Sequence, residues 1–586
     1  MKRIQGLAPV VAALLLVSCG GEETPSVEAS AVKTGSGGQA GTSAQASPCP
    51  SSVATNQNFA CELASSAANT EWQLIGAPEG MVIQAESGTI HWTPLSNQRG
   101  NTSFTARAIS DGTAVDTTIR VNVKSGNNDA PGIYVSPNGD DSASGNATAP
   151  LRTIQAAVDA VQPGQTIYIR GGEYRNAEFG QPYAGRQEAS LVQITTGGTA
   201  SQPITMQPHG DEYVTLRSDV NGIRFSNDAT DHWTIRGLRL VGNAQQLSED
   251  IALANWWSDE PILPMQGRGI GGQMDHVTIE DTIVQDFPGA GIAPRRSEYV
   301  TIRNNMVFNN AWWSTAGTHG ITVSNMKPSA QSTNQTVVIE GNVVWGNQSL
   351  VISHVFSKGK VTLVLDEGNG IHLQNNQETF GNEALVQNNL VMWNGKAGLG
   401  INTMNRATIS NNSFFQNARV VERNGELSNQ SSILRDVSNN LFHPRLDRRT
   451  ILDSADSFAN VGTNATLAGV SGDTLLPTSV MRLSAVFANP GALDFSPSAS
   501  ASTSMGVASG VLTSMFEKLR EYGINPIQPN QPYEDNPYLL NQKARIMATW
   551  PARYGHLLLE DKALGYTYTY AQRCYYPQVP ASSDCP

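Results

Sequence analysis

Short apolar runs, punctuated by Gly and Asn, recur through the middle of the chain. The most regular is a Gly-Ile pair, whose Ile residues are Ile223, Ile270, Ile292, Ile321, Ile371 and Ile401. Successive members are 47, 22, 29, 50 and 30 residues apart, and a second β-branched run such as Val300-Thr301-Ile302 follows most of them. Short β-branched runs at a spacing of about one coil indicate a repeat array. Because no 3.6-residue apolar period is present, we predict a right-handed parallel β-helix and not a helical solenoid.

Alternation along a strand predicts where these side chains point. The Ile is expected to point into the coil, whereas the Gly before it and the residue after it are expected to point outward. Asn pairs at the bends fit an internal ladder, in which each amide bonds to the coils above and below. These pairs are Asn304-Asn305, Asn388-Asn389, Asn411-Asn412 and Asn439-Asn440.

The N-terminus has the pattern of an exported lipoprotein. Lys2 and Arg3 precede an apolar run that is too short to span a bilayer, which indicates a signal peptide over residues 1–18. The run ends in Leu-Val-Ser-Cys19, which resembles a bacterial lipobox and implies that Cys19 is acylated. An ordinary signal peptide with a chance Cys is the alternative. Acylation implies a protein of the bacterial cell envelope, anchored to the outer membrane through lipid only.

Residues 19–48 are rich in Gly, Ser, Ala, Thr and Glu and predict a flexible tether. The four cysteines beyond Cys19 fall in two close pairs. Because an exported chain meets an oxidising compartment, we predict the disulfides Cys49–Cys61 and Cys574–Cys585.

Residues 49–125 alternate short strands with turns. The segments Ala77-Pro-Glu-Gly-Met81, Gly88-Thr-Ile90 and Trp92-Thr-Pro94 resemble the immunoglobulin-like modules of bacterial surface proteins. The resemblance implies a small β-sandwich that acts as a spacer or binding module and carries no catalysis. A Gly-, Asn- and Pro-containing linker follows at residues 126–132.

The β-helix is expected over residues 133–500. Its first part reads as a strand, a helix with apolar Ile154, Ala157, Val158 and Val161, a Pro-Gly turn and a second strand. This order resembles the entry to the pectate-lyase-like β-helix superfamily, in which the helix caps the open end of the solenoid. The resemblance implies the fold and leaves lyase, hydrolase, epimerase and non-enzymatic functions open.

Residues 485–500 resemble the last coil of such proteins. Residues 501–586, with a helix over 510–522, are expected either to cap the C-terminal end or to fold back on the flank of the solenoid. The net charge of −12 argues against nucleic acid as a partner, and a monomer is expected.

Aligning the coils on the recurring Ile brings candidate chemistry onto one face. Lys396 and Asp366 each lie five residues before an aligned Ile, so neighbouring coils would place them roughly 5 Å apart. The other polar residues expected to converge on this face are Arg268, Arg295, Arg296, His319, Glu367, His372, Asn402 and Arg406.

The longest spacings mark inserted loops. These loops carry Trp256-Trp257 and Trp312-Trp313, and residues 350–366 have the pattern of a hairpin. Exposed indole faces suit the apolar faces of sugar rings, so the Trp pairs are expected to form a substrate-binding rim. The alternative is that they form the cores of the loops.

This constellation fits β-elimination on a uronic acid polymer. The reaction needs a base for the proton next to the carboxylate and a cation that neutralises the carboxylate as the enolate forms. Lys396 is the predicted base, and Arg295 or Arg268 the predicted neutralising group. His319 and His372 are further catalytic candidates.

The carboxylates Asp366 and Glu367 could hold Ca²⁺ or serve a glycoside hydrolase, which is the second hypothesis. A polygalacturonase is disfavoured because its Asn-Thr-Asp element is absent, and the epimerase element around Asp-Pro-His is absent too. A non-catalytic surface protein that binds glycan is the third hypothesis. Lys396 and Asp366 would then form a plain surface ion pair of little energetic value, and the two histidines would be ladder residues.

Overall fold

The structure is a computed structural model, which describes part of the chain. It describes residues 44–524, with gaps at 47–48, 66–69, 84, 86, 96–97, 127–129, 177–189, 227–229, 248–251, 253–263, 315–316, 329–333, 352, 358–359, 365–366, 375–380, 405, 421–423, 431–435, 447, 454–461, 471–478, 508 and 522–523. Cys19, Trp256, Trp257, Asp366 and the Cys574–Cys585 pair lie outside the described residues. Within them, no helix is long and apolar enough to cross a membrane.

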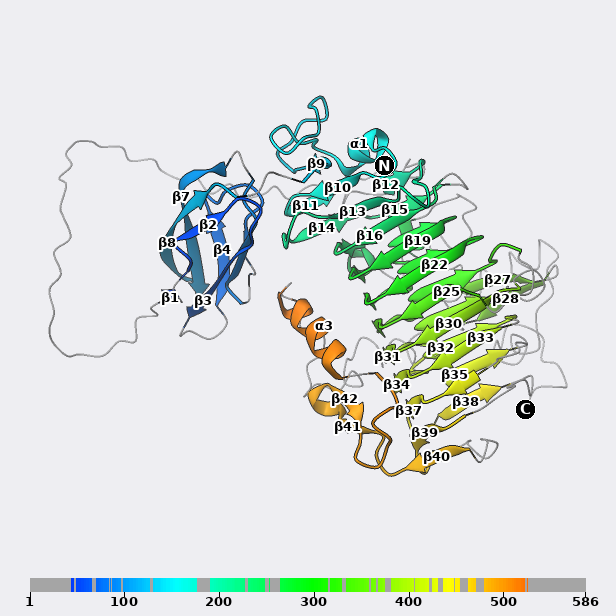
Figure 1. Ribbon diagram of the computed structural model, residues 1–586. Coiled ribbons are helices and arrows are strands. Elements are labelled where there is room, and N and C mark those ends of the chain that lie inside the picture. Colours follow the sequence, from blue (N-terminus) through cyan, green and yellow to red (C-terminus); the bar gives the residue numbers. More distant parts are fainter. Residues whose placement is uncertain are drawn as a thin grey trace, which may run out of the picture. The chain divides into compact units, whose positions relative to one another are not determined.

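Most of the described chain winds through three parallel sheets, visible in Figure 1 as successive stacked arrows. Sheet I contains β9 (Ile133–Val135), β10 (Thr166–Ile169), β13 (Ile204–Pro208), β16 (Trp233–Arg236), β19 (Asp275–Glu280), β22 (Glu298–Arg303), β25 (Gln335–Glu340), β30 (Glu383–Gln387), β33 (Ala407–Ser410) and β36 (Asp436–Ser438).

Each coil continues from sheet I through sheet II and sheet III. Sheet II contains β11 (Gly172–Arg175), β14 (Val214–Arg217), β17 (Arg239–Val241), β20 (Ile283–Gln285), β23 (Met306–Phe308), β26 (Val343–Trp345), β31 (Leu390–Met392), β34 (Ser413–Phe415), β37 (Leu441–His443), β39 (Asn464–Leu467) and β40 (Val480–Leu483). Sheet III contains β12 (Ser190–Ile194), β15 (Asn221–Phe225), β18 (Ile270–Gly272), β21 (Ile292–Pro294), β24 (Ile321–Ser324), β29 (Ile371–Gln374), β32 (Leu399–Asn402), β35 (Gly425–Gln430) and β38 (Arg449–Asp453). The predicted parallel β-helix is therefore confirmed.

The recurring Ile lies inside the solenoid, as predicted. Consecutive coils place Ile223, Ile270, Ile292, Ile321 and Ile371 opposite one another, and each is fully buried. The next residue in this column is Leu399 and not Ile401, because Ile371 pairs with Leu399. The alignment on Ile401 was therefore wrong by two residues. Both residues point inward, since they are two apart on one strand, and pattern alone does not choose between them.

The Gly that precedes each inward residue faces the interior, which corrects the prediction that it points outward. A Cβ added to Gly291 would lie 2.6 Å from Val307 Cγ1 and 2.9 Å from Asn310 Nδ2. At this bend the backbone passes close to the packed interior, so strand alternation does not extend to the Gly. Glycine is required there because a side chain has no space.

The predicted Asn ladder is present at the bend between sheets I and II. At each step the backbone N–H and the Nδ2–H of one Asn both donate to the Oδ1 of the next, over 2.9–3.0 Å. The members are Asn305, Asn342, Asn389, Asn412, Asn440 and Asn464. The Asn before several of them, such as Asn304, adopts a positive φ of 55°, which Asn tolerates better than most residues.

A second ladder, not predicted from the sequence, follows the bend between sheets II and III. It joins Asn310, Asn347, Asn394 and Asn417 through the same pattern of donors. The ladder ends on Glu426, whose carboxyl accepts the backbone N–H of Asn417 at 3.1 Å and its Nδ2–H at 2.5 Å. Because Leu427 pairs with Leu399, Glu426 occupies the position that Gly398 has one coil earlier. Burial raises the pKa of this carboxyl from 4.5 to about 8.

The N-terminal end of the solenoid carries the predicted capping helix, α1 (Ile154–Ala160). The Thr153 side chain accepts the N–H of Ala156 and so satisfies one free donor of the first turn. Ile154, Ala157 and Val158 are buried against the first coil. The helix thus covers apolar surface that the first coil would otherwise expose.

Before the solenoid, two small sheets share one hydrophobic core. One contains β1 (Ala44–Ala46), β3 (Phe59–Ser65), β6 (Thr89–Trp92) and β5 (Val82–Ile83); the other contains β2 (Ser52–Ala54), β8 (Thr113–Lys124), β7 (Gly100–Ser110) and β4 (Glu71–Ile75). Phe59 and Trp92 from the first and Phe104 and Val121 from the second are buried in this core. The predicted disulfide Cys49–Cys61 is present. The immunoglobulin-like character of this segment stays a prediction.

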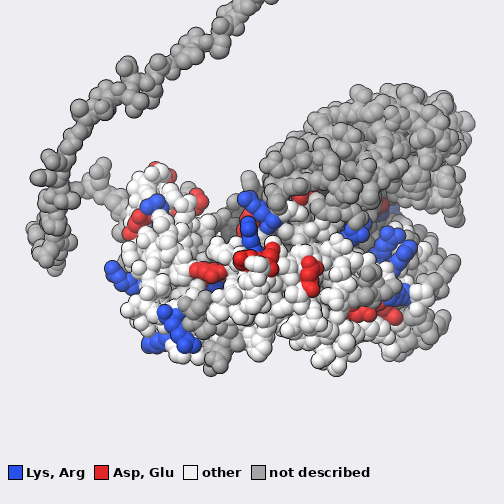
Figure 2. Space-filling view, turned by 90° about the horizontal axis from the view of Figure 1, so that it is seen from above, with Lys and Arg blue, Asp and Glu red and all other residues white. Residues whose placement is uncertain are grey.

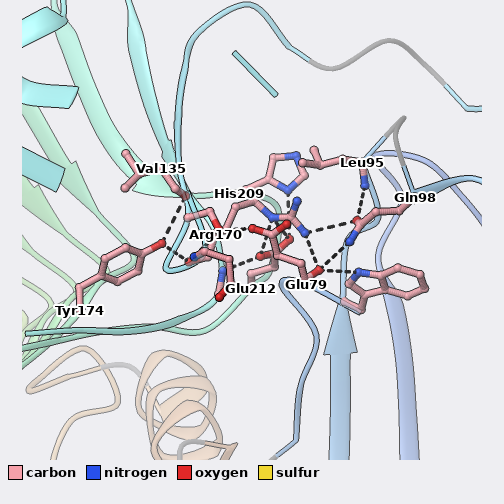
Figure 3. A network of polar contacts seen from close by, with 12 residues as sticks. Glu79, Leu95, Gln98, Val135, Arg170, Tyr174, His209 and Glu212 are labelled. Carbon is pink, nitrogen blue, oxygen red and sulfur yellow. Dashed lines mark hydrogen bonds and ion pairs between the residues drawn. The ribbon is translucent and has the colours of Figure 1, made fainter. Parts of the chain in front are cut away.

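A buried polar network joins the loop at Glu79 to the first coils, as Figure 3 shows. Arg170 and Glu212, both fully buried, form an ion pair at 3.0 Å. Arg170 Nη2 also donates to the Glu79 carbonyl at 2.8 Å, and that oxygen accepts two further bonds, from Gln98 Nε2 at 2.9 Å and from Trp92 Nε1 at 3.2 Å. A Cβ on Gly80 would lie 2.1 Å from Arg170 Nη2, so only Gly fits beside the guanidinium.

The C-terminal part folds back on sheet II, which is one of the two predicted alternatives. The strands β41 (Phe487–Asn489) and β42 (Asp494–Pro497) form an antiparallel hairpin, so residues 485–500 are not a last parallel coil. The helix α3 (Ser509–Glu521) buries Leu512, Phe516 and Leu519 against outward side chains of sheet II. Because sheet II is apolar on both faces, it needs this cover.

The predicted loop hairpin and the short helical turns complete the described elements. Strands β27 (Ser353–Ser357) and β28 (Lys360–Val364) pair in antiparallel fashion, which confirms the hairpin. The 3-10 turns are η2 (Ala244–Gln246), η3 (Pro264–Gln266) and η4 (Pro490–Ala492). Figure 2 shows one face on which most of the described surface is uncharged and both signs of charge occur, which agrees with the low content of charged residues, 15%.

Candidate active site

Sheet III presents two rows of side chains on its outer face, and their order follows from the strand register. The first row is Arg224, Gly271, Ala293, Thr322, His372, Gly400 and Ser428. The second row is Arg295, Ser324, Gln374, Asn402 and Gln430. Both rows carry cationic groups at the early coils and neutral polar groups at the later coils.

Two predicted site residues, His319 and His372, come together on adjacent coils. Their ring centroids lie 4.1 Å apart with 47° between the ring planes. His319 precedes β24 and His372 lies on β29, the next strand of sheet III. Both side chains are nearly fully buried. Gly400 makes room for the pair, since a Cβ there would lie 2.7 Å from His372 Nδ1.

Asn369 holds both imidazoles. Its backbone N–H donates to His319 Nδ1 at 3.1 Å, and its Nδ2 lies 3.2 Å from His319 Nδ1 and 3.1 Å from His372 Nδ1. An amide nitrogen only donates, so both Nδ1 atoms act as acceptors and carry no proton. The Asn369 Oδ1 in turn accepts the N–H of Ala397, the residue after Lys396, at 3.0 Å.

The two histidines are neutral at neutral pH. Burial, and next the positive charge of Lys396, lowers the pKa of His372 to about 3. Burial, followed by His372 and Lys396, lowers the pKa of His319 well below its usual value. The positive charge of Lys396 thus acts on both rings.

Glu367 adds a carboxylate to this group. Its Oε2 lies 3.4 Å from His319 Nε2, and its side chain is 15% exposed. Since His319 accepts at Nδ1, its proton is on Nε2, which lies near this carboxylate without forming a hydrogen bond to it. Gly317 packs against Glu367, for a Cβ there would lie 2.6 Å from Oε1. Glu367, His319, Asn369 and His372 therefore form one connected buried cluster.

Lys396 lies one coil further, at the level of Gly368. Its N–H donates to the Gly368 carbonyl at 3.0 Å, and its side chain is half-buried. The predicted juxtaposition with Asp366 depended on the Ile401 alignment, which the register corrects. Lys396 stacks on Gly368 because the inward residue of its coil is Leu399, three positions later.

Three arginines gather on the earlier coils of the same face. Arg268 is half-buried and its Cδ packs over Gly271, while Arg224 and Arg295 lie on the neighbouring strands. Burial, with the charges of Arg295 and Arg224, lowers the pKa of the Arg268 guanidinium. The three cations are therefore close enough to act on one another.

The remaining predicted binding residues lie in different settings. Asn402 is on the second row, opposite Gln374. Arg296 and Arg406 lie in the bends that lead from sheet III to sheet I, since β22 begins at Glu298 and β33 at Ala407. They are beside the outer face of sheet III and not on its rows.

The prediction that Trp312 and Trp313 form an exposed rim is wrong. Both indoles are buried with Ala244, Leu350 and Val351 in a cluster of their own. Trp312 Nε1 donates to the Gly346 carbonyl at 3.1 Å and Trp313 Nε1 to the Ala244 carbonyl at 2.8 Å. They form the cores of the loops, which is the alternative prediction. A buried indole whose N–H is hydrogen-bonded stabilises the loop through packing.

Of the two predicted calcium ligands, Glu367 is described and Asp366 lies outside the described residues, so the described part of the site supplies one carboxylate. Ca²⁺ takes six to eight oxygen ligands, usually with several carboxylates. Here the Glu367 carboxylate faces an imidazole N–H, the Asn369 oxygen accepts a backbone N–H, and Lys396 adds positive charge. Among the described residues no group of three or more His, Cys, Asp or Glu side chains is arranged to hold a metal ion.

Comparison with known proteins gives the family. Residues 133–430 match the model described as "Pel9A-like, right handed beta helix region". The chain belongs to this family. The Pel9A-like match covers both rows of sheet III, the histidine cluster and Lys396. It also gives the hand of the parallel β-helix, which is right-handed.

A curated relative of this Pel9A-like chain is a pectate lyase, PEL9 of Emericella nidulans. The two are 25% identical over 330 residues, which is 50% of this chain and 74% of the relative. Similar solved structures include "pectate lyase Pel9A", at 16% identity and a TM-score of 0.30 over 61% of this chain and 90% of that one. A "rhamnogalacturonan lyase" matches at 13% identity and a TM-score of 0.30, over 57% and 84%. The sequence match to PEL9 thus relates the chain to a pectate lyase.

The role of Asn369 was missed from the sequence. The signal was available, because Asn369 stands directly before Gly370-Ile371, where three of the six Gly-Ile pairs have Arg268, Ala290 or Leu399. Arg224 was recognised as an outward residue but not as part of a cationic group. Its link to Arg268 and Arg295 depends on which coils are neighbours, which only the register shows.

Proposed function

We propose that this protein is a polysaccharide lyase that cleaves an anionic, uronate-containing polysaccharide by β-elimination. The observation that carries the proposal is the grouping on sheet III of Lys396, the neutral His319–His372 pair and the three arginines. The relationship to a pectate lyase supports it. Lys396 supplies a candidate base, and the arginines of the earlier coils supply cationic groups for other carboxylates of an anionic polymer that lies along the face.

In this proposal Lys396 acts from its uncharged form and removes the proton next to the sugar carboxylate. The electron pair of that C–H bond forms a carbon–carbon double bond, while the glycosidic C–O bond on the adjacent carbon breaks. The leaving oxygen takes up a proton, so the products are one unsaturated end and one new saturated end. The reaction also needs a cation at the carboxylate as the proton leaves. Among the three arginines Arg295 is nearest to Lys396 along the solenoid, three strand spacings away, and is the candidate for this role.

The histidine cluster positions Lys396 in this scheme. Asn369 binds both imidazoles and also fixes the backbone at Ala397, so the residue after Lys396 cannot shift independently of the cluster. Because both rings are neutral, they add no positive charge beside the candidate base. Such fixed geometry favours proton transfer, since a base must lie within hydrogen-bond reach of its proton.

The test is turnover on a panel of anionic polysaccharides, followed by ultraviolet absorbance of the unsaturated end. We expect Lys396→Ala to abolish absorbance while polymer binding persists, and Lys124→Ala, an exposed lysine on β8, to leave turnover unchanged. Full activity of Lys396→Ala would exclude Lys396 as the base. New reducing ends without absorbance would instead support a glycoside hydrolase, and binding without products would support a glycan-binding protein.

We further propose that the protein is anchored in the bacterial cell envelope, on the outer membrane, through acylated Cys19. The support is the short apolar run followed by Leu-Val-Ser-Cys19. Polysaccharide would then be its substrate outside the cell, and lipid its sole membrane contact.

A further inference from the structure

We infer that Arg224 and Arg268 form a second carboxylate-binding subsite, remote from Lys396, and that the preferred substrate is a long, uronate-rich polymer and not a short oligomer. The inference rests on the proposed lyase function and adds to it the length and charge of the polymer that the same face binds. Arg295, which lies nearer to Lys396 along the solenoid, is left to the sugar at the cleaved bond.

The strand register gives the distance between this subsite and Lys396. Arg224 lies on β15, Arg268 two residues before β18, and Lys396 three residues before β32 begins at Leu399. The sheet order β15-β18-β21-β24-β29-β32 puts five strand spacings between Arg224 and Lys396 and four between Arg268 and Lys396. At the usual strand spacing the two arginines are roughly 24 and 19 Å from Lys396 along the solenoid. A pyranose ring in an extended polymer advances by about one such spacing, so the subsite is several sugars from the cleaved bond.

Arg268 extends across the outer face of sheet III towards Arg224. Its Cδ would lie 3.5 Å from a Cβ on Gly271, and Gly271 is the residue of β18 that pairs with Arg224. Burial, and next the charges of Arg295 and Arg224, lowers the pKa of Arg268. The guanidinium groups of these coils are therefore close enough to repel one another and to bind one anionic sugar.

Arg268 has like charges beside it and, in the described part of the chain, no acidic partner. The described arginines that form ion pairs with carboxylates are Arg107, Arg170, Arg217, Arg236 and Arg303. A half-buried cation beside like charges destabilises the fold, both through repulsion and through lost hydration. A carboxylate would relieve both effects, since a guanidinium group binds it through two parallel N–H donors.

The surface between this subsite and Lys396 suits a sugar chain. From Gly271 the first row continues through Ala293, Thr322, His372 and Gly400. The second row offers the hydrogen-bonding side chains Ser324, Gln374 and Asn402, which suit sugar hydroxyls. Because most of the first row is small, a polymer bound at Arg268 can continue along sheet III to Lys396.

The first measurement is binding of hexagalacturonate to the full chain by isothermal titration calorimetry. All proteins carry Lys396→Ala, so that the ligand is not consumed. Adding Arg268→Met should weaken binding by about tenfold or more, the loss expected for one charged hydrogen-bonded contact, and Arg268→Lys should recover part of it. Arg217→Met is the matched control, because Arg217 lies on sheet II in an exposed pair with Glu173.

Fully methyl-esterified hexagalacturonate tests the role of the carboxylates. Its affinity should be the same with and without Arg268→Met, because no carboxylate reaches the guanidinium group. Absence of hexagalacturonate binding, or equal losses for the charged and the esterified ligand, contradicts the inference.

The second measurement compares initial rates on trigalacturonate and hexagalacturonate, with Lys396 intact. A trimer that is cleaved at Lys396 ends before Arg268, whereas a hexamer can reach it. Arg268→Met should therefore lower kcat/KM on the hexamer by about tenfold, through KM, and leave the trimer within about twofold of the wild type. An equal fall on both lengths would place Arg268 at the cleaved bond or in the fold, and would overturn the inference.

Thermal unfolding separates binding from folding. Arg268→Met keeps an apolar stem over Gly271 and removes like charge, so its unfolding temperature should equal or exceed that of the wild type. Should it unfold at a lower temperature, Arg224→Gln tests the same subsite from the neighbouring coil. Hexagalacturonate affinity equal to that of the wild type in Arg224→Gln would then contradict the inference.

These measurements also distinguish the inference from the proposed function. Arginine-dependent binding of hexagalacturonate without unsaturated ends from any polymer of the panel would support the subsite and exclude the lyase. Unsaturated ends together with wild-type rates of Arg268→Met on the hexamer would support the lyase and exclude the subsite.

Discussion

His319 and His372 share one donor, the Nδ2 group of Asn369, which lies 3.2 Å from Nδ1 of the first and 3.1 Å from Nδ1 of the second. The two rings come from adjacent coils, 4.1 Å apart between centroids. Because one amide serves both Nδ1 atoms, protonation of either imidazole at Nδ1 would break its bond to the amide. Asn369 therefore holds both histidines in their neutral form, together with burial.

Replacing the Asn369 amide by a carboxylate should favour the protonated form of the histidines over the neutral form. We expect Asn369→Asp to raise the pKa of His372 from about 3 by roughly two units or more, since a neighbouring negative charge favours imidazolium. The measurement is a pH titration of the imidazole ¹⁵N resonances. Asn402→Asp, on the second row, is the control and should shift neither ring. An unchanged His372 titration in Asn369→Asp would show that burial alone keeps the ring neutral.

The buried Glu426 predicts a stability that falls as the pH rises. The folded-state pKa of Glu426, about 8, lies above the ordinary value of 4.5, so the folded protein holds a proton that the unfolded chain releases between these values. Unfolding is therefore favoured progressively from about pH 4.5 to pH 8, with a slope approaching 1.4 kcal/mol per pH unit, an order-of-magnitude value.

Glu426→Gln keeps the ladder partner and removes the ionisation. In urea unfolding between pH 5 and 8, to be run on both proteins, we expect this variant to lose most of the pH slope that the wild type has. Glu340→Gln, whose side chain lies on the outside of sheet I, should leave the slope in place. A slope equal to that of the wild type in Glu426→Gln would mean that other groups cause it.

The Arg170–Glu212 pair predicts a large loss of stability when one partner is removed. Arg170→Met leaves Glu212 buried without its cation, which typically costs about 3–5 kcal/mol. Arg170→Met combined with Glu212→Gln should be less destabilised than the single variant, because no unpaired charge remains.

Chemical denaturation measures both variants, and Arg217→Ala provides the comparison. Arg217 forms an exposed pair with Glu173, with 32% and 42% of the side chains exposed, so its loss should cost less than about 1 kcal/mol. Equal effects of Arg170→Met and Arg217→Ala would show that the buried pair contributes no more than a surface pair.

Acylation of Cys19 is tested in a bacterial host. Metabolic labelling with a fatty acid analogue should mark the wild-type protein, and Cys19→Ser should be unlabelled and absent from the membrane fraction. The expected cause is thioether attachment of lipid at the residue that becomes the N-terminus. Soluble, unlabelled wild-type protein would rule out the lipid anchor.

The sequence predicted features that each coil specifies locally. The inward Ile residues, the second Asn of each pair, the hairpin before Asp366 and the helix near residue 515 follow from alternation and from turn-forming residues, and the structure contains all of them. The predictions that failed concern positions that depend on the length of a bend. The length of the bend before β32 sets Leu399 and not Ile401 opposite Ile371, and no local pattern encodes that length.

The sequence also did not predict which long side chains are buried. Trp312 and Trp313 have the composition of a sugar-binding rim, yet each indole N–H bonds to a backbone carbonyl of another coil or loop. The grouping of Arg224 with Arg268 arises from residues 44 positions apart and depends on the loop between them. The site could therefore be predicted by residue type and face but not by which residues touch.

The two Asn ladders limit how this solenoid can change in length. Every internal rung donates its Nδ2–H to the Oδ1 of the Asn on the next coil, and its own Oδ1 accepts the Nδ2–H of the Asn on the coil before. Inserting or deleting one whole coil that carries both Asn residues preserves every rung, whereas a fraction of a coil leaves an amide buried with no partner on one side. The solenoid can therefore change in length only by complete coils. Between homologues, loops can differ in sequence and length, whereas the Asn residues of a ladder must stay aligned from coil to coil.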